Sequence, residues 1–264
     1  MKIHLIPFAG LGNRLRVISS VYKYSLENSC ELTIHWNKEK GLNAGFYDLF
    51  KPNEKLNISD SVISDFFIYN YPSKYNMCIP KFFDKILGRK SFYSIGINAI
   101  DEIAKNNKEA IVSTYSQQGE LYPLAELFVP QDDIQQTISE IKSKFGTYTI
   151  GCHIRRTDNK QAKESSKLDI FFERFDSLFS TNPTAKIFLC TDDQEVKESI
   201  IAKYGNERII TYNSTLSRNS KKGIKDAVVE LYSLASTDVI WGSYYSSYTD
   251  MASAIYGKQL EIIK

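Results

Sequence analysis

The chain has 264 residues, of which 42% are apolar and 24% charged. These proportions are close to those of average globular proteins, so the composition excludes a disordered chain or a fibrous repeat, and the length suits one or two domains. The 33 Lys and Arg nearly balance the 31 Asp and Glu. We therefore expect no nucleic-acid partner and no general anionic-membrane surface, and any anion site should be local.

The cysteines and the chain start carry no sign of secretion. Cys30, Cys78, Cys152 and Cys190 form no CxxC pair, and only His153 lies close to one of them. Free, buried thiols are therefore expected rather than a zinc site or a disulfide framework. The opening residues KIHLIPF lack the apolar stretch and cleavage site of a signal peptide. We expect a cytoplasmic protein, or one held peripherally at the inner face of a membrane.

The N-terminal half opens as a strand, a glycine turn, a helix and a second strand. Apolar residues at helical spacing follow the turn, and such an opening is typical of an α/β sheet. The predicted elements are a strand at 2–8, a helix at 13–28, a strand at 31–36, short strands and loops within the Phe- and Tyr-rich stretch 60–98, and a strand at 110–116.

A second unit is expected from residue 132 onward. Strands alternate there with helices of 10 to 15 residues, which predicts a parallel sheet with helical crossovers. The fold class is therefore α/β, with two Rossmann-like domains of the GT-B type, 1–131 and 132–264, facing a cleft. The predicted helices are 132–145, 168–180, 195–205, 224–237 and 249–257, and the predicted strands are 147–154, 185–191, 207–212 and 238–242.

Polar clusters follow four of the predicted strands. Ligands of open parallel sheets bind beyond the carboxyl ends of the strands, so these clusters are expected to outline one pocket. Adjacent arginines suit phosphate, because guanidinium binds it through two hydrogen bonds and stays charged. The clusters are Gly10, Gly12, Asn13 and Arg14; His153, Arg155, Arg156 and Asp158; Asp192 and Asp193; and Ser243, Ser246 and Ser247.

Each cluster also has a purely structural interpretation. The glycines either permit positive φ at a tight turn or let backbone N–H groups approach an anion. One of the two arginines is expected to face the ligand, while the other anchors the loop through Asp158 or Asp192; a structural salt bridge is the alternative. One of Asp192 and Asp193 is expected to cap the next helix. The serines are either a helix cap or a phosphate seat, and Glu230 either faces solvent or reaches the cleft.

The segments HIRRTD, FLCTDD and AVVELYSLASTDVIWGSYYSS, in this order, resemble the GDP-fucose-dependent fucosyltransferases. The match is best to the α-1,6-fucosyltransferases, including the bacterial nodulation enzymes, and more distant to the α-1,2- and protein O-fucosyltransferases. It covers residues 147–257, and in the first half it rests on GLGNRL alone. The resemblance implies a GT-B fold, an inverting mechanism, GDP-fucose as donor and no metal.

The resemblance also implies residue roles. Arg155 would hold the β-phosphate and stabilise GDP as it leaves, and Glu230 would recognise guanine, at a position where the family has Asp. His153 would contact the nucleotide, and Ser246 and Ser247 would bind phosphate, as would Gly10, Gly12 and Asn13 from the opposite domain. Arg156 and Asp158 would shape the loop, and Asp192 or Asp193 would order the arginines or reach the ligand. Arg14 and Ser243 complete the predicted site.

The chemistry of the reaction adds two expectations. A diphosphate leaving group needs its charge neutralised, by a divalent metal or by arginine and a helix N-terminus. The sequence has no DxD, so we expect the second solution, without metal or cofactor. The acceptor hydroxyl must lose a proton to a base, for which Asp158 and Glu164 are both candidates.

We expect fucose transfer to a glycan acceptor, an oligosaccharide or a lipid-linked glycan, in bacterial surface polysaccharide synthesis. Two alternatives stay open: a glycosyltransferase that uses another GDP-sugar, and a catalytically silent module that binds a nucleotide or glycan. The stretch from Phe66 to Tyr93 either stacks on sugar faces or forms ordinary core.

Overall fold

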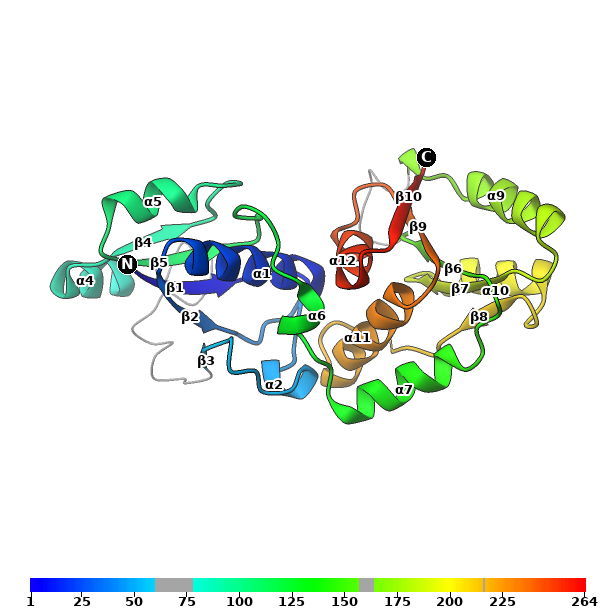
Figure 1. The fold of residues 1–264 in the computed structure, drawn as a ribbon, viewed down its shortest axis with the longest axis horizontal. Helices are drawn as coiled ribbons and strands as arrows, with labels where there is room; N and C mark the ends of the chain where they lie inside the picture. The colour runs from blue at the N-terminus through cyan, green and yellow to red at the C-terminus, as the bar shows by residue number, and fades with distance from the viewer. Residues whose placement is uncertain (60–77, 157–163, 216) are drawn as a thin grey trace. The chain divides into compact units, whose positions relative to one another are not determined.

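The computed structural model describes residues 1–59, 78–156, 164–215 and 217–264. It divides into two compact units, Met1–Val129 with Arg218–Lys221 and Pro130–Ser217 with Lys222–Lys264. Each unit contains one parallel five-stranded sheet with helices around it (Figure 1). The predicted α/β class with two Rossmann-like parallel sheets is therefore confirmed.

In unit 1 the strand order is β3-β2-β1-β5-β4, and all neighbouring strands are parallel. Helix α1 packs on β1 and β2. Its buried face is formed by Leu15, Ile18 and Val21, which recur at helical spacing. The elements are β1 (Lys2–Pro7), α1 (Leu11–Glu27), β2 (Glu31–His35), α2 (Phe46–Leu49), β3 (Ile58–Ser59), α4 (Cys78–Leu87), β4 (Lys90–Tyr93), α5 (Ile100–Asn106), β5 (Glu109–Thr114) and α6 (Leu124–Leu127).

In unit 2 the strand order is β10-β9-β6-β7-β8, again entirely parallel. Helix α12 packs on β9 and β10, and α10 on β7 and β8. The elements are α7 (Asp132–Lys142), β6 (Thr149–Ile154), α9 (Leu168–Thr181), β7 (Lys186–Thr191), α10 (Gln194–Tyr204), β8 (Ile209–Thr211), α11 (Lys221–Ala235), β9 (Val239–Ser243), α12 (Ser247–Tyr256) and β10 (Gln259–Ile263).

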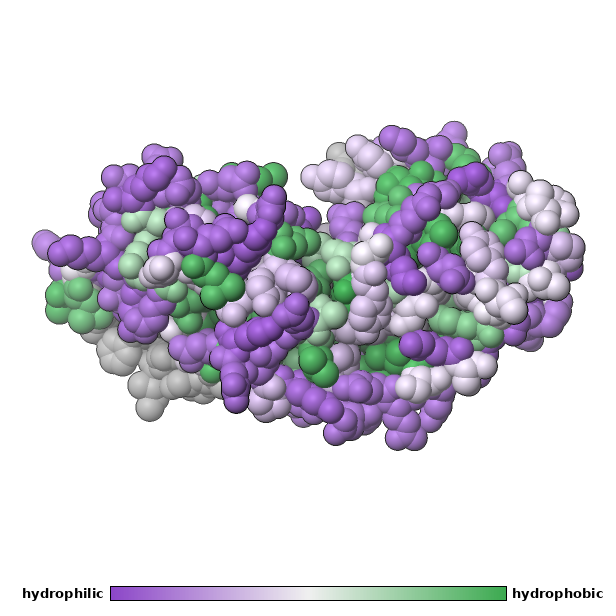
Figure 2. All heavy atoms as spheres, in the orientation of Figure 1, coloured by the Kyte–Doolittle hydropathy of each residue, from purple (hydrophilic) through white to green (hydrophobic). Residues whose placement is uncertain are grey.

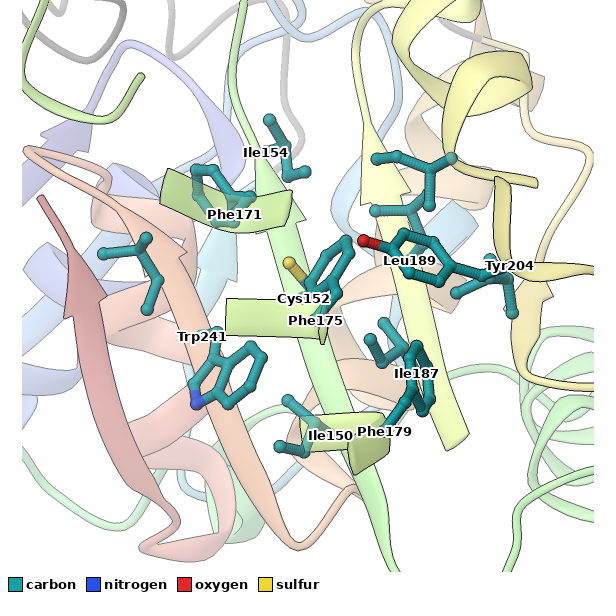
Figure 3. Close-up of a cluster of buried hydrophobic side chains, with 13 residues drawn as sticks. Ile150, Cys152, Ile154, Phe171, Phe175, Phe179, Ile187, Leu189, Tyr204 and Trp241 are labelled. Atoms are coloured by element: carbon teal, nitrogen blue, oxygen red, sulfur yellow. The ribbon is translucent and has the colours of Figure 1, made fainter. Parts of the chain in front are cut away.

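The core of unit 2 lies between α9 and the sheet (Figure 3). Phe171 and Phe175 lie four residues apart on α9, so they share one helix face, and both are fully buried. The Phe175 ring stacks on Trp241 of β9 with centroids 6.1 Å apart. Each buried phenylalanine contributes about 1.5–3 kcal/mol through removal of its ring from water. This packing holds the central strands, and with them their carboxyl ends, in fixed register.

The structure corrects several element boundaries. Strand β10 was not predicted; it is an edge strand whose Gln259 is exposed and whose Ile263 is buried, so its apolar pattern is weak. Helices α1 and α12 each begin two residues before the predicted start. The predicted burial of cysteines is confirmed for Cys152 and Cys190, and burial raises the pKa of both thiols.

The visible surface is largely hydrophilic, with separate small apolar areas (Figure 2). One exposed apolar group lies on α4, where Phe82, Ile86 and Leu87 are each more than half exposed. Within the described ranges, no helix combines the length and the apolar character needed to cross a membrane.

Candidate functional site

The carboxyl ends of three neighbouring strands of unit 2 carry most of the predicted site. Strand β6 lies between β9 and β7, so the residues that follow these strands meet at one edge of the sheet. Ser243, at the end of β9, accepts a hydrogen bond from the Arg155 backbone N–H at 3.0 Å and donates to the His153 carbonyl at 3.3 Å. Its hydroxyl is buried. Ser243 therefore fixes the course of the arginine loop rather than presenting its hydroxyl to solvent.

The two adjacent aspartates, Asp192 and Asp193, have different hydrogen-bond partners. Asp193 caps α10, because its Oδ1 accepts from the backbone N–H groups of Glu195 at 3.0 Å and Val196 at 3.2 Å. Asp192 Oδ1 accepts from the Arg156 backbone N–H at 2.6 Å. One aspartate caps the helix, as expected, and the other orders the arginine loop, through the main chain of Arg156.

The Arg156 guanidinium keeps hydrogen-bonding capacity. Its Nη2 is buried and has no hydrogen-bond partner among the described residues. Burial lowers the pKa of Arg156, and the negative charges of Asp193 and Asp192 oppose that shift. A buried donor without a partner is costly, so this guanidinium is suited to receive an anionic group.

A strained turn follows β9 and leads into α12. Tyr245 has φ 59°, a left-handed conformation that is uncommon for a residue other than glycine. The next residue, Ser246, is the N-cap of α12 and is 2% exposed, and its Oγ is buried without a partner in the described part of the chain. Ser247 begins the helix, where backbone N–H groups are unpaired and the helix dipole favours negative charge. This turn therefore combines a spare hydroxyl with spare amide donors.

Two supporting residues of this edge were missed by sequence reasoning. The Ser166 hydroxyl accepts from the Tyr244 N–H at 2.8 Å and donates to the Ile263 carbonyl at 2.5 Å, which fixes the serine turn. The Tyr248 ring lies 5.0 Å from the His153 ring. Ser166 carried no sequence signal, because its partners are distant in the chain, whereas Tyr248 lies directly after the predicted serines.

A second group of polar residues surrounds Glu230 on α11. Glu230 Oε1 accepts a hydrogen bond from Ser214 Oγ at 2.8 Å. Burial raises the pKa of Glu230 to about 7, against the opposing effects of Ser214 and the Lys197 charge. Burial therefore favours the neutral, protonated form of this carboxyl group more than in an exposed glutamate.

The loop that carries Ser214 is fixed by Asp226, a further residue that was not predicted. Asp226 is 5% exposed, and it accepts from Tyr212 Oη at 2.8 Å and from the Thr215 N–H at 2.7 Å. Burial acts to raise the pKa of Asp226, but the hydrogen bonds from Lys222, Thr215 and Tyr212 lower it below its ordinary value. Asp226 lies one helical turn before Glu230, which is a signal that the sequence did contain.

The glycines of the turn in unit 1 do not provide positive φ, which was the structural interpretation of their presence. Neither Gly10 nor Gly12 has positive φ; Gly10 has φ −69°, a value open to any residue. The left-handed residue is Ala9, with φ 69°. Asn13 Oδ1 accepts from Arg16 Nη2 at 2.8 Å. The predicted phosphate contacts of Gly10, Gly12 and Asn13 stay predictions.

Arg14, a predicted residue of the donor-substrate site, is buried and hydrogen-bonded within unit 1. Its side chain is 1% exposed. Nε donates to the Ala9 carbonyl at 3.1 Å, Nη1 to the Asn37 carbonyl at 2.6 Å, and Nη2 to the Glu39 carboxylate. The guanidinium also lies 4.9 Å from the Trp36 ring. These contacts bury the charge inside unit 1, because the segment after β2 closes over it.

Of the two predicted bases, only Glu164 lies in the described part of the chain. Asp158 lies outside the described residues. Glu164 is described and exposed. No group of three or more His, Cys, Asp or Glu side chains within the described residues is arranged to hold a metal ion.

Comparison with known proteins identifies the fold class. No protein-family model and no curated protein matches the sequence. Solved structures do match: the chain has the fold of the GDP-fucose fucosyltransferases.

Three of these structures illustrate the match. A FUT1 variant from Arabidopsis thaliana bound to GDP has a TM-score of 0.64 at 14% identity, over 99% of this chain and 69% of that one. The α-1,6-fucosyltransferase NodZ, in a crystal soaked with GDP-fucose, has a TM-score of 0.66 at 14% identity, over 96% and 92%. POFUT1 in complex with GDP-fucose has a TM-score of 0.61 at 10% identity, over 99% and 98%.

Proposed function

We propose that this protein is an inverting, metal-independent glycosyltransferase that transfers fucose from GDP-fucose to a glycan acceptor. The observation that carries the proposal is the donor-rich edge of unit 2. There, the buried Ser246 hydroxyl and the Arg156 Nη2 both lack partners among the described residues, beside the Arg155 loop and the start of α12. The fold shared with the GDP-bound FUT1 variant and with NodZ supports the same conclusion.

The reaction is a single displacement. The acceptor oxygen forms a bond to the anomeric carbon of fucose while the bond from that carbon to the β-phosphate oxygen breaks, and its electron pair leaves with GDP. Arg155, Ser246, Ser247 and the N-terminus of α12 stabilise the growing diphosphate charge, which is the work that a divalent cation would otherwise do. Asp192 keeps the loop in place through the Arg156 backbone N–H, the Arg156 Nη2, unpartnered among the described residues, supplies a further donor to the diphosphate, and His153 contacts the nucleotide.

The acceptor proton passes to a carboxylate. Asp158 and Glu164 are the proposed bases, since both follow the arginine loop along the chain. Replacing each by the amide separates them, because only loss of the base should lower turnover while leaving GDP affinity unchanged.

Glu230 is proposed to recognise guanine. A carboxylate offers two acceptor oxygens, which match the N1–H and N2–H donors on one edge of that base. The Ser214 hydrogen bond orients the carboxyl group, and Asp226 fixes the loop that bears Ser214.

Unit 1 is proposed to bind the acceptor, an oligosaccharide or a lipid-linked glycan of bacterial surface polysaccharide synthesis. This assignment follows from giving the nucleotide to unit 2.

The decisive test is Arg155→Ala, with Arg174→Ala as a matched control. Arg174 is an exposed arginine of α9 that pairs with Glu261 of β10. We expect Arg155→Ala to lower GDP-fucose turnover by about 100-fold to 1,000-fold, as loss of a charge-stabilising donor does elsewhere, and Arg174→Ala to leave it unchanged. Unchanged turnover in Arg155→Ala would contradict the proposal.

Two further measurements test the details. Turnover should persist in excess EDTA, and NMR of the first product formed should show the inverted anomeric configuration. A panel of GDP-sugars tests the donor: faster consumption of another GDP-sugar would replace fucose in the proposal. Tight GDP binding without product from any donor and acceptor would indicate a silent binding module.

A further inference from the structure

Three aromatic side chains gather at the carboxyl edge of the unit 1 sheet. Phe8 follows β1, Tyr93 ends β4 and Tyr115 follows β5, and these strands are neighbours in the order β1-β5-β4. The Phe8 ring stacks on Tyr93 with centroids 5.8 Å apart and planes 15° apart. It meets Tyr115 edge-on at 5.3 Å. We call these three residues the aromatic shelf.

The shelf is open to solvent although its members pack on one another. Tyr93 is 39% exposed and Tyr115 is 44% exposed. Large aromatic side chains are usually buried to a greater extent, and a contiguous exposed group of them marks a binding surface. The shelf also lies at the edge where parallel sheets bind their ligands.

Polar groups of α1 border the shelf. Arg16 Nη2 donates to the Tyr115 carbonyl at 3.4 Å and to Asn13 Oδ1 at 2.8 Å. The Arg16 Nε is buried and has no partner among the described residues. A buried N–H group without an acceptor is costly, so the Arg16 Nε indicates that a ligand supplies the acceptor.

The backbone that presents Phe8 is strained and supported. Ala9 has φ 69°, and the buried Arg14 holds its carbonyl through a hydrogen bond of 3.1 Å. Non-glycine residues in this conformation persist only where the surroundings fix them, and they cluster at binding and active sites. The position of the Phe8 ring is therefore set before any ligand arrives.

A sugar ring fits both parts of this surface. A pyranose presents a face of axial C–H groups, which packs on an aromatic ring, and a rim of hydroxyl oxygens, which accept from guanidinium and carboxamide groups. A purely apolar peptide would leave the Arg16 donor unpaired. A nucleobase could also stack, and the experiment below separates it from a sugar.

We propose that the aromatic shelf binds a pyranose ring of the acceptor glycan. Its role toward an acceptor rests on the proposed function, whereas sugar binding by the shelf can be measured without it. Tyr115 and Tyr93 supply the stacking surface, and Arg16 binds a ring hydroxyl at the border.

The test is saturation-transfer difference NMR on the full chain with three probes at millimolar concentration: methyl β-galactoside, methyl β-N-acetylglucosaminide and guanosine. We expect transfer to the axial C–H protons of at least one glycoside. The transfer should fall at least fivefold in Tyr115→Ala and Tyr93→Ala and persist in Tyr115→Phe, which keeps the ring. Tyr256→Ala is the matched control, because Tyr256 is a 50% exposed tyrosine of unit 2.

Each outcome decides the proposal. Absence of transfer to both glycosides in the wild type, or equal transfer in folded Tyr115→Ala, overturns it. Transfer to guanosine alone that is lost in Tyr115→Ala overturns it in favour of a nucleobase site. Calorimetry with GDP on the same samples keeps the two proposals apart: if GDP does not bind but shelf-dependent glycoside transfer persists, the proposed function fails and the shelf stands.

Discussion

Replacement of Glu230 by glutamine tests the guanine site with two opposite effects. Glutamine has nearly the same shape but no charge and only one acceptor oxygen, so its amide N–H₂ would face a donor of guanine. A hydrogen bond to a charged group is worth about 1.5–3 kcal/mol. At about 1.4 kcal/mol per tenfold, Glu230→Gln should weaken GDP binding by about 10-fold to 150-fold at pH 8.

The raised pKa of Glu230 makes this effect depend on pH. With a pKa of about 7 in the free protein, the carboxyl group is about nine-tenths ionised at pH 8 and about one-tenth ionised at pH 6. Only the ionised form accepts from both guanine donors, so the affinity of the wild type should fall about tenfold between these pH values. GDP itself titrates in this range, but Glu230→Gln carries the same GDP contribution, and the difference between the two profiles belongs to Glu230.

The same pKa predicts a gain in stability for the variant. The folded state holds the Glu230 proton more tightly than the unfolded chain, whose carboxyl has the ordinary value of 4.5. The stability that this provides is complete below pH 4.5 and is lost as the pH rises through about 7. A neutral glutamine avoids the loss, so the variant should be more stable than the wild type at pH 8, by at most about 3 kcal/mol.

The assay is calorimetry with GDP at pH 6, 7 and 8, paired with urea unfolding at the same pH values. Glu173→Gln, on the exposed face of α9, is the control and should change neither quantity. A variant that merely damaged the fold would lose affinity and stability together. Equal GDP affinity of wild type and Glu230→Gln at pH 8 would refute the guanine assignment.

Three more predictions concern the framework of the two units. Arg14→Met should lower the free energy of unfolding by about 3 kcal/mol in urea titrations, because it leaves the Glu39 charge and two carbonyls without their buried partner; equal stability would contradict the structural role. Asp193→Ala removes the cap of α10 and should cost about 1 kcal/mol, measured in the same way. Burial lowers the pKa of His35 to about 4, so its stability contribution is present above about 6.5 and is lost as the pH falls toward 4. His35→Leu should therefore flatten the loss of stability between pH 6.5 and 4, which has a slope of at most about 1.4 kcal/mol per pH unit, and an unchanged slope would refute this origin.

The alternation of strands and helices was predictable in unit 2 because each element there has a clear period. Strand β6 is buried at nearly every position, and α9 repeats phenylalanine every fourth residue. The Phe- and Tyr-rich stretch 60–98 lacks such contrast. Short strands and loops were predicted there, which is right for β4 but wrong for the helix α4, and residues 60–77 lie outside the described ranges.

The role of a site residue was predictable where it depends on neighbours in the sequence. It was not predictable where it depends on contacts with residues distant in the chain. The division of labour between Asp192 and Asp193 follows from helix capping, a local rule. The burial of Arg14 depends instead on the approach of Asn37 and Glu39, more than twenty residues away. Ser166 joins the serine turn to β10, an element whose own pattern was too weak to predict.

Two strand-to-helix turns each contain a non-glycine residue in the left-handed conformation. Ala9, just before α1, has φ 69°, and Tyr245, just before α12, has φ 59°. A left-handed conformation costs an L-residue about 1–2 kcal/mol, and glycine avoids this cost at an entropic expense of about 0.5–1 kcal/mol. Ala9→Gly should therefore raise the free energy of unfolding by about 0.5–1 kcal/mol, whereas Ala99→Gly, at φ −76°, should lower it. Urea titrations that showed equal losses for both variants would mean that the Ala9 turn stores no strain, and would remove that support for a preformed aromatic shelf.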